Sequence, residues 1–171
     1  AVALKLLDTE DPAASLREVA TCGRLSHPCI VPILDMGVVD GRAWLASPWL
    51  AGGNLRQSPS SQWSELRGLV LSLLDALGHA HARGILHRDV KPDNVLFDPS
   101  TGAWRLADFG IARIMHGEQS AVHTMGTPWY MSPEQITGDR SRQRPWSDLY
   151  SVACLVWHVA TGMPPFTGTL V

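Results

Sequence analysis

A dense group of charged and polar side chains lies in residues 84–97, GILHRDVKPDNVLF, between short apolar flanks. Asp89 and Asn94 carry oxygen atoms in this stretch, and Lys91 carries an ammonium group. Carboxylate and amide oxygens suit a hard cation such as Mg²⁺, and a carboxylate beside such a cation can orient a hydroxyl group and accept its proton. The stretch therefore predicts a metal site with a proton acceptor next to it.

A further acidic residue, Asp108, follows in the segment ADFG. It comes directly after an expected strand, and Gly110 gives the backbone beside it conformational freedom. Asn94 and Asp108 flank one expected hairpin, so we expect their side chains to converge on the same divalent cation, with Asp89 nearby.

Two charges near the start of the chain occupy positions that are otherwise apolar. Lys5 shares one face of an expected strand with apolar neighbours, and Glu18 falls on the same helical stripe as Cys22 and Leu25. A buried ammonium group is costly unless it is paired. We therefore predict an ion pair between Lys5 and Glu18 that holds Lys5 against a phosphate group.

The elements that position these residues divide the chain into two parts. Residues 1–8 alternate as a strand, and a helix capped by Asp11 with Pro12 at its first position is expected to reach about Leu25. Residues 29–47 read as two strands joined at Asp40-Gly41, a strong hairpin signal. The Gly-, Ser- and Pro-rich stretch that follows predicts a boundary between residues 1–50 and residues 51–171.

The second part is predicted to be mainly helical. A helix is indicated by apolar residues at helical spacing, namely Trp63, Leu66, Val70, Leu74 and Leu77. A hairpin around residues 99–102 and a largely buried helix over residues 148–161, ending at Gly162, complete this part.

Composition excludes several classes of function. With 171 residues, 45% of them hydrophobic, the chain is long enough to bury a core, and its net charge of −2 offers no basic field for nucleic acid. No apolar run reaches the ~20 residues of a membrane span. Three widely spaced cysteines without a CxxC motif argue against a disulfide framework or a zinc site and favour a cytoplasmic location.

Four segments, in this order and spacing, resemble motifs of the protein kinases. AVALK resembles the strand that carries the nucleotide-binding lysine, HRDVKPDN the catalytic loop, DFG the metal-binding motif, and GTPWYMSPE the end of the activation loop. The resemblance implies an α+β, two-lobed protein-kinase-like fold, with an incomplete β-rich small lobe over residues 1–50 and a partial helical large lobe over residues 51–171. Lys91 and Thr127 resemble the residues of the Ser/Thr-directed members. The sequence around the catalytic loop is similar to that of bacterial members.

The resemblance also implies roles in the reaction. Asp89 would accept the proton of the substrate hydroxyl, and Lys91 would steady the phosphoryl group in transfer. Asn94 and Asp108 would hold Mg²⁺. Lys5, kept in place by Glu18 as predicted above, would bind the α- and β-phosphates of ATP.

The nucleotide base is expected at the segment that joins the two parts. Pro48 would offer its carbonyl to the adenine amine, since proline lacks a donor but keeps its acceptor, and Leu50 would offer backbone groups. Ala3 and Leu96 would sandwich the ring, and Asn54 would lie near the ribose.

Other residues are implied to support or regulate the site. His87 and Phe109 would join an apolar column that links the lobes, Asp148 would anchor the catalytic loop, and Thr127 would place a hydroxyl near Asp89. Glu134 would need a partner from helices beyond residue 171. Three more residues are expected to act in regulation: Arg88, Ser120 and Thr124. A phosphate on Ser120 or Thr124, added within a dimer, would pair with Arg88 and order the loop.

The chain departs from the family pattern in one main respect, and two other classes of protein are alternatives. No G-x-G-x-x-G-x-V loop precedes Lys5, so we expect the 171 residues in isolation to be inactive, although the longer protein would phosphorylate Ser and Thr of protein substrates. A pseudokinase or scaffold module is one alternative, but such modules lose the equivalents of Lys5, Asp89 or Asp108, which are all present here. A small-molecule phosphotransferase of the same fold is the other, and it would lack the GTPWYMSPE segment.

Overall fold

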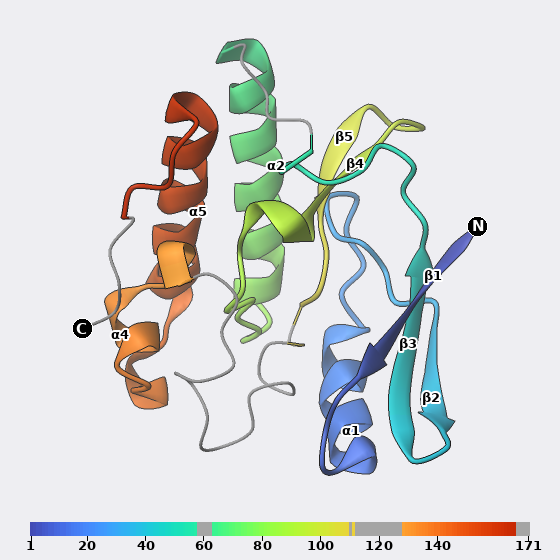
Figure 1. Ribbon diagram of the computed structural model, residues 1–171. Coiled ribbons are helices and arrows are strands. Elements are labelled where there is room, and N and C mark those ends of the chain that lie inside the picture. The colour runs from blue at the N-terminus through green and yellow to red at the C-terminus, as the bar shows by residue number, and fades with distance from the viewer. Residues whose placement is uncertain (58–62, 110, 112–127, 167–171) are drawn as a thin grey trace.

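The computed structural model describes residues 1–57, 63–109, 111 and 128–166. These residues form a three-stranded sheet with one helix, a two-stranded hairpin and a group of helices, so the predicted α+β class is confirmed (Figure 1). The elements in chain order are β1 Val2–Leu7, α1 Pro12–Cys22, β2 Asp35–Val39, β3 Arg42–Pro48, α2 Trp63–His81, η1 Pro92–Asn94, β4 Val95–Asp98, β5 Ala103–Leu106, η2 Pro128–Tyr130, α4 Pro133–Ile136, η3 Arg140–Arg142 and α5 Pro145–Thr161.

The three-stranded sheet is antiparallel and has the order β1-β3-β2. The turn between β2 and β3 places Asp40 and Gly41 in the left-handed region, at φ 49° and 70°, which matches the twist of a tight hairpin. The predicted hairpin is therefore confirmed, but its first strand begins at Asp35 and not near residue 29. The preceding residues pair elsewhere: the Val31 amide donates to the Leu106 carbonyl at 2.9 Å, so this loop attaches to β5.

Helix α1 begins as its sequence predicts and ends early. The Asp11 side chain accepts a hydrogen bond from the Ala14 amide at 2.9 Å, and Pro12 occupies the first turn. The helix ends at Cys22, where the Gly23 amide bonds to the Val19 carbonyl, three residues before the expected Leu25. Its buried face packs on the sheet in a small core made of Leu7, Val19, Ala43, Leu45 and Ile111.

Helices α2 and α5 form the larger core. The face of α2 that is buried carries Leu66, Leu69, Leu73, Ala76, Leu77 and Ala80. The predicted stripe was therefore partly wrong: Trp63 is 76% exposed and Leu74 is 42% exposed. Helix α2 carries apolar residues on more than one face. Their spacing alone therefore did not identify the face that packs on β5 and α5.

The β4–β5 hairpin lies between α2 and the three-stranded sheet (Figure 1). It also pairs with the segment that joins the two parts, since the Leu55 amide donates to Val95 at 2.9 Å and the Phe97 amide donates to Gly53 at 3.0 Å. In the described part of the chain, no helix combines the length and the apolar character needed to cross a lipid bilayer.

Gly52 belongs to this joining segment and lies close to Phe97 of β4. A Cβ atom at Gly52 would lie 2.5 Å from the Phe97 carbonyl oxygen, closer than atoms can approach. We expect Gly52→Ala to lower the free energy of unfolding by about 1–3 kcal/mol, because backbone must move to accept the methyl group. Urea denaturation measures the change.

Gly68→Ala is the matched control. Gly68 lies in α2, and a Cβ atom there would meet nothing within 4 Å. Alanine should raise the free energy of unfolding by about 0.5–1 kcal/mol, because it loses less backbone entropy in a helix. Equal denaturation midpoints for the two variants would contradict the close packing of Gly52 on Phe97.

Candidate active site

Asp148, buried near the start of α5, holds the backbone of the loop that carries Asp89. Its carboxylate accepts hydrogen bonds from the His87 amide at 2.9 Å and the Arg88 amide at 2.8 Å. The His81 ring lies 2.7 Å from the same carboxylate. Burial acts to raise the pKa of Asp148, but the hydrogen bonds from His81 and the loop outweigh it, so the pKa lies below its usual value. Asp148 is thus a charged anchor for the loop.

Two residues of the site have a left-handed backbone although they are not glycine. Arg88 has φ 65° and Asp108 has φ 68°. Such conformations cost free energy and persist only where the surroundings hold them, commonly at functional sites. At Arg88 the surroundings are Asp148 and Gln135, whose Nε2 donates to the Arg88 carbonyl at 2.7 Å.

His87 connects this loop to the segment around Asp108. Its Nδ1 accepts a hydrogen bond from the Asp89 amide at 3.2 Å, which assigns the proton to Nε2, and Nε2 donates to the Ala107 carbonyl at 2.8 Å. The ring packs edge-on against Phe109 with 4.6 Å between centroids. Phe109 in turn lines a cavity with Cys22 and Ile33, the other two residues expected in the apolar column.

The carboxylate of Asp89 is held by two neighbours from the same loop. Asn94 Nδ2 donates to the Asp89 carbonyl at 2.8 Å and to its Oδ2 at 2.9 Å. The ammonium group of Lys91 lies 2.7 Å from Oδ2. Because the nitrogen of the Asn94 amide faces Asp89, its oxygen faces away and can serve another ligand.

Asn94 and Asp108 are held close through the backbone. The Ala107 amide donates to the Asn94 carbonyl at 2.8 Å, and Asp108 is the next residue. Both side chains offer oxygen, which is the ligand that hard divalent cations prefer. The pair fits the predicted cation site.

Lys5 has a different partner from the one that the sequence predicted. Its Nζ lies 2.6 Å from Asp108 Oδ2, so the structure pairs it with Asp108 and not with Glu18. Lys5 is also only partly buried, since its side chain is 38% exposed. Among the described strands β1 is an edge strand, which leaves its side chains more open to solvent than the strand-face argument assumed.

Three of the residues expected around the nucleotide base lie on strands, namely Ala3 on β1, Pro48 on β3 and Leu96 on β4. Asn54 forms an isolated bridge with Leu96, and Val2, next to Ala3, is opposite Pro48 across β1 and β3. Leu50 is partly buried just beyond β3. The Asn54–Leu96 bridge ties the segment after β3 to the β4–β5 hairpin, and the role of the five residues in binding the base stays a prediction.

Glu134 has a partner within the chain, contrary to the expectation that it needs one from beyond residue 171. The Ser147 hydroxyl donates to Glu134 Oε1, and this hydrogen bond lowers the pKa of Glu134. Glu134 is only partly buried, so it is not the isolated buried acid that was expected. Three predicted residues lie outside the described part of the chain: Ser120, Thr124 and Thr127.

Two contacts that support the site, made by His81 and by Gln135, were not predicted from the sequence. His81 on Asp148 joins residues far apart in the chain, and no local pattern marks it. Gln135 was detectable in part, because Ser132 and Gln135 have capping-box spacing and both Ser132 groups donate to Gln135 Oε1 at 3.0 Å. Its second role, on the Arg88 carbonyl, has no such signal.

The chain has a small β-sheet part with one helix and a helical part. Between them lies a loop that carries Asp89 and Asn94, with Asp108 nearby, which is the arrangement of a protein kinase domain. The chain belongs to the protein kinase domain family, whose model matches residues 1–170. Members of this family use ATP and a divalent metal ion.

Curated relatives are bacterial serine/threonine-protein kinases. The chain is 40% identical to the DNA damage-responsive serine/threonine-protein kinase RqkA of Deinococcus radiodurans, over 98% of this chain and 27% of the relative. It is 36% identical to the serine/threonine-protein kinase pkn3 of Myxococcus xanthus, over 94% and 32%, and 38% identical to PknD of Mycobacterium tuberculosis, over 96% and 26%. The chain thus spans about a quarter to a third of the length of these relatives.

Proposed function

We propose that this chain carries the phosphoryl-transfer site of a serine/threonine protein kinase, which moves the γ-phosphoryl group of ATP to Ser and Thr hydroxyls of proteins with the help of Mg²⁺. The observation that carries the proposal is the fixed carboxylate of Asp89, held by Asn94 and Lys91 on a loop that Asp148 anchors. Positioning and charge stabilisation supply most of the catalysis in this reaction.

Asp89 is the proposed proton acceptor. As the substrate oxygen forms its bond to phosphorus, the bond from phosphorus to the oxygen bridging to the β-phosphate breaks, and the hydroxyl proton passes to the Asp89 carboxylate. Lys91, 2.7 Å from that carboxylate, brings positive charge to the place where the phosphoryl group is transferred.

The proposed cation ligands are Asn94 and Asp108. A divalent cation bound there would neutralise the charge of the phosphate oxygens. Asn94 suits this role because its amide nitrogen is engaged with Asp89 and its oxygen is turned outward. Lys5, which already reaches Asp108, is positioned to bind a phosphate next to that cation.

Lys5→Met tests the proposed site. We expect kcat/KM for ATP to fall by about 10²-fold, because the charge that binds the phosphates is lost while the length of the side chain is kept. The measurement is steady-state phosphorylation of a Ser/Thr-containing protein substrate by the full-length protein, with varied ATP.

Arg42→Met is the matched control for charge on the same sheet. Arg42 lies on β3 and pairs with Asp8 at 2.8 Å, but both side chains are exposed, and such surface pairs contribute little. Its kcat/KM should stay within about twofold of the wild type. A Lys5→Met variant as active as Arg42→Met would remove Lys5 from phosphate binding.

A further inference from the structure

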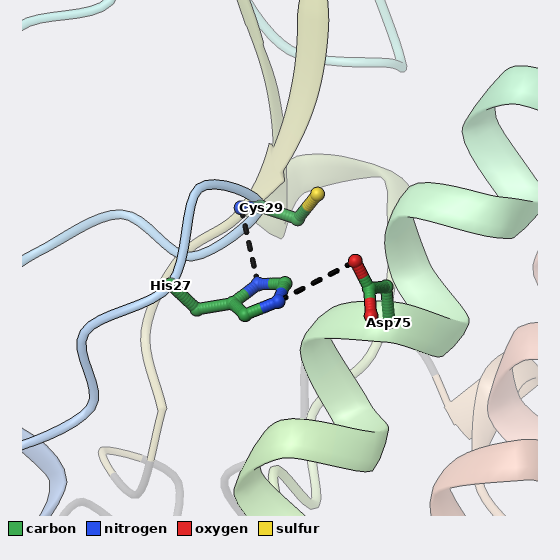
Figure 2. A group of neighbouring side chains, drawn as sticks. All are labelled: His27, Cys29 and Asp75. Atoms are coloured by element: carbon green, nitrogen blue, oxygen red, sulfur yellow. Dashed lines mark hydrogen bonds and ion pairs between the residues drawn. The ribbon is translucent and has the colours of Figure 1, made fainter.

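A second group of reactive side chains lies away from the catalytic loop, where the loop after α1 meets α2 (Figure 2). His27 and Cys29 come from that loop, and Asp75 comes from α2. One ligand atom from each lies within 4.8 Å of the other two. Figure 2 shows the Cys29 sulfur, the His27 ring and the Asp75 carboxylate around one space.

His79 adds an independent observation at the same place. It lies one helical turn after Asp75 on α2, so the two residues share a face. Its ring centroid is 4.8 Å from that of His27. Its Nε2 atom is buried and has no hydrogen-bond partner in the part of the chain that the structure describes. A buried ring nitrogen without a partner is costly, and this one lies on the helix face that borders the group.

We propose that His27, Cys29 and Asp75 bind a zinc ion, with water in the fourth position. Sulfur, imidazole nitrogen and carboxylate oxygen are the ligands that zinc takes, usually four in a tetrahedron. Mg²⁺ and Ca²⁺ prefer oxygen alone, so this set is distinct in kind from Asn94 and Asp108.

One pair of the ligand atoms already has the spacing of a zinc site. Bonds of 2.0–2.3 Å in a tetrahedron place ligand atoms about 3.3–3.8 Å apart. His27 Nε2 and Asp75 Oδ2 already lie 3.4 Å apart. The Asp75 side chain is 68% exposed and that of His27 is 14% exposed, so the site has an open side for metal entry and a protected side.

Binding requires one change of protonation at His27 and one at Cys29. At present Nδ1 accepts a hydrogen bond from the Cys29 amide, which leaves the proton of the neutral ring on Nε2 facing Asp75. Zinc at Nε2 displaces that proton, and Nδ1 takes one up, so the ring stays neutral. The amide contact that is given up is 3.2 Å long, at the weak end of hydrogen bonds. The Cys29 thiol releases its proton, so one proton leaves for each zinc bound.

A metal here would strengthen the connection between two parts of the fold that already share a core and the His27–Asp75 contact. The loop holding Cys29 is bonded to β5, since the Leu106 amide donates to the Cys29 carbonyl at 2.8 Å. Zinc would fasten the same loop to α2. The site therefore acts as a clamp between the end of the small lobe and the main helix of the large lobe.

Cobalt and zinc titrations of the metal-free full-length protein test the proposal, with saturating Mg²⁺ and ATP to occupy the oxygen-only site. We expect one zinc per chain by competition with a chromophoric chelator, and with Co²⁺ the near-ultraviolet charge-transfer band of a thiolate ligand. Cys29→Ser should abolish the band and weaken zinc binding by about tenfold or more. Asp75→Asn, at an exposed position that does not contribute to the core, should weaken zinc binding similarly without disturbing the fold.

Cys22→Ser is the matched control. Cys22 lines the cavity that also contains Asp108, so it is the thiol that a metal at the nucleotide site could reach. The band should persist in Cys22→Ser, and zinc should raise the Tm of the wild type and of this control but not of Cys29→Ser. Absence of the band in the wild type, its survival in Cys29→Ser, or unchanged zinc affinity in Asp75→Asn would overturn the proposed site.

Discussion

Replacing Asp89 with asparagine is expected to lower kcat for phosphoryl transfer by about 10²-fold or more and to leave nucleotide affinity nearly unchanged. Asparagine has the shape of aspartate but cannot accept the proton of the substrate hydroxyl. The side chain does not carry the oxygen atoms assigned to the cation, which belong to Asn94 and Asp108. Steady-state phosphorylation and equilibrium binding of a nucleotide analogue separate the two effects.

Asp93→Asn provides the control within the same loop. Asp93 pairs with Arg56 at 2.9 Å, and both side chains are partly exposed, so the variant removes a carboxylate from the loop without touching Asp89. Its kcat should remain within about twofold of the wild type. If Asp89→Asn and Asp93→Asn lower kcat equally, the loop tolerates no loss of charge at all, and Asp89 has no special role as base.

Asp148→Asn is expected to produce the largest loss of stability, about 3–5 kcal/mol, together with loss of activity. One carboxylate now serves two backbone amides and the His81 ring, and an amide side chain presents a single oxygen to those donors. The buried donors left without a partner account for the cost. Urea denaturation of the variant against the wild type measures it, with Asp8→Asn, an exposed member of a surface pair, as control.

The contribution of Asp148 to the free energy of unfolding should also depend on pH. Its pKa is lower in the folded chain than the value of 3.8 for a free side chain, so the folded chain binds this proton less readily than the unfolded chain. The stabilisation is therefore fully present above the unfolded pKa and is lost as the pH falls through the folded value. The stability difference between wild type and Asp148→Asn should narrow below about pH 4 and stay constant near neutrality. A difference that grows on acidification would contradict a charged anchor.

Local signals in the sequence predicted local structure well. Asp11 and Pro12 start α1 as expected, and Asp40-Gly41 makes the predicted turn, because each of these depends on backbone preferences of adjacent residues. The loop that carries Asp89 could be recognised because its motif is local: Lys91 and Asn94, which both contact Asp89, lie within five residues of it.

Contacts between distant segments could not be predicted in the same way. The partner of Lys5 depends on where the edge strand β1 lies relative to β5, and the buried face of α2 depends on which neighbours pack against it. The grouping of His27 with Asp75 likewise exists only after the loop has docked on the helix. Sequence spacing contains none of this geometry, so a cysteine with no CxxC partner gave no sign of the proposed zinc site.

The small core beneath the three-stranded sheet includes Ile111, which follows the Asp108 segment and lies far along the chain from Leu7 and Val19. A ribosome produces the sheet strands long before it produces that residue. The nascent sheet therefore exposes an incomplete apolar interior until the catalytic loop and both hairpins have emerged. Contacts between such distant residues close large loops and form slowly. The small lobe is thus expected to mature with the large lobe during synthesis, and to depend on chaperones in the interval between the two.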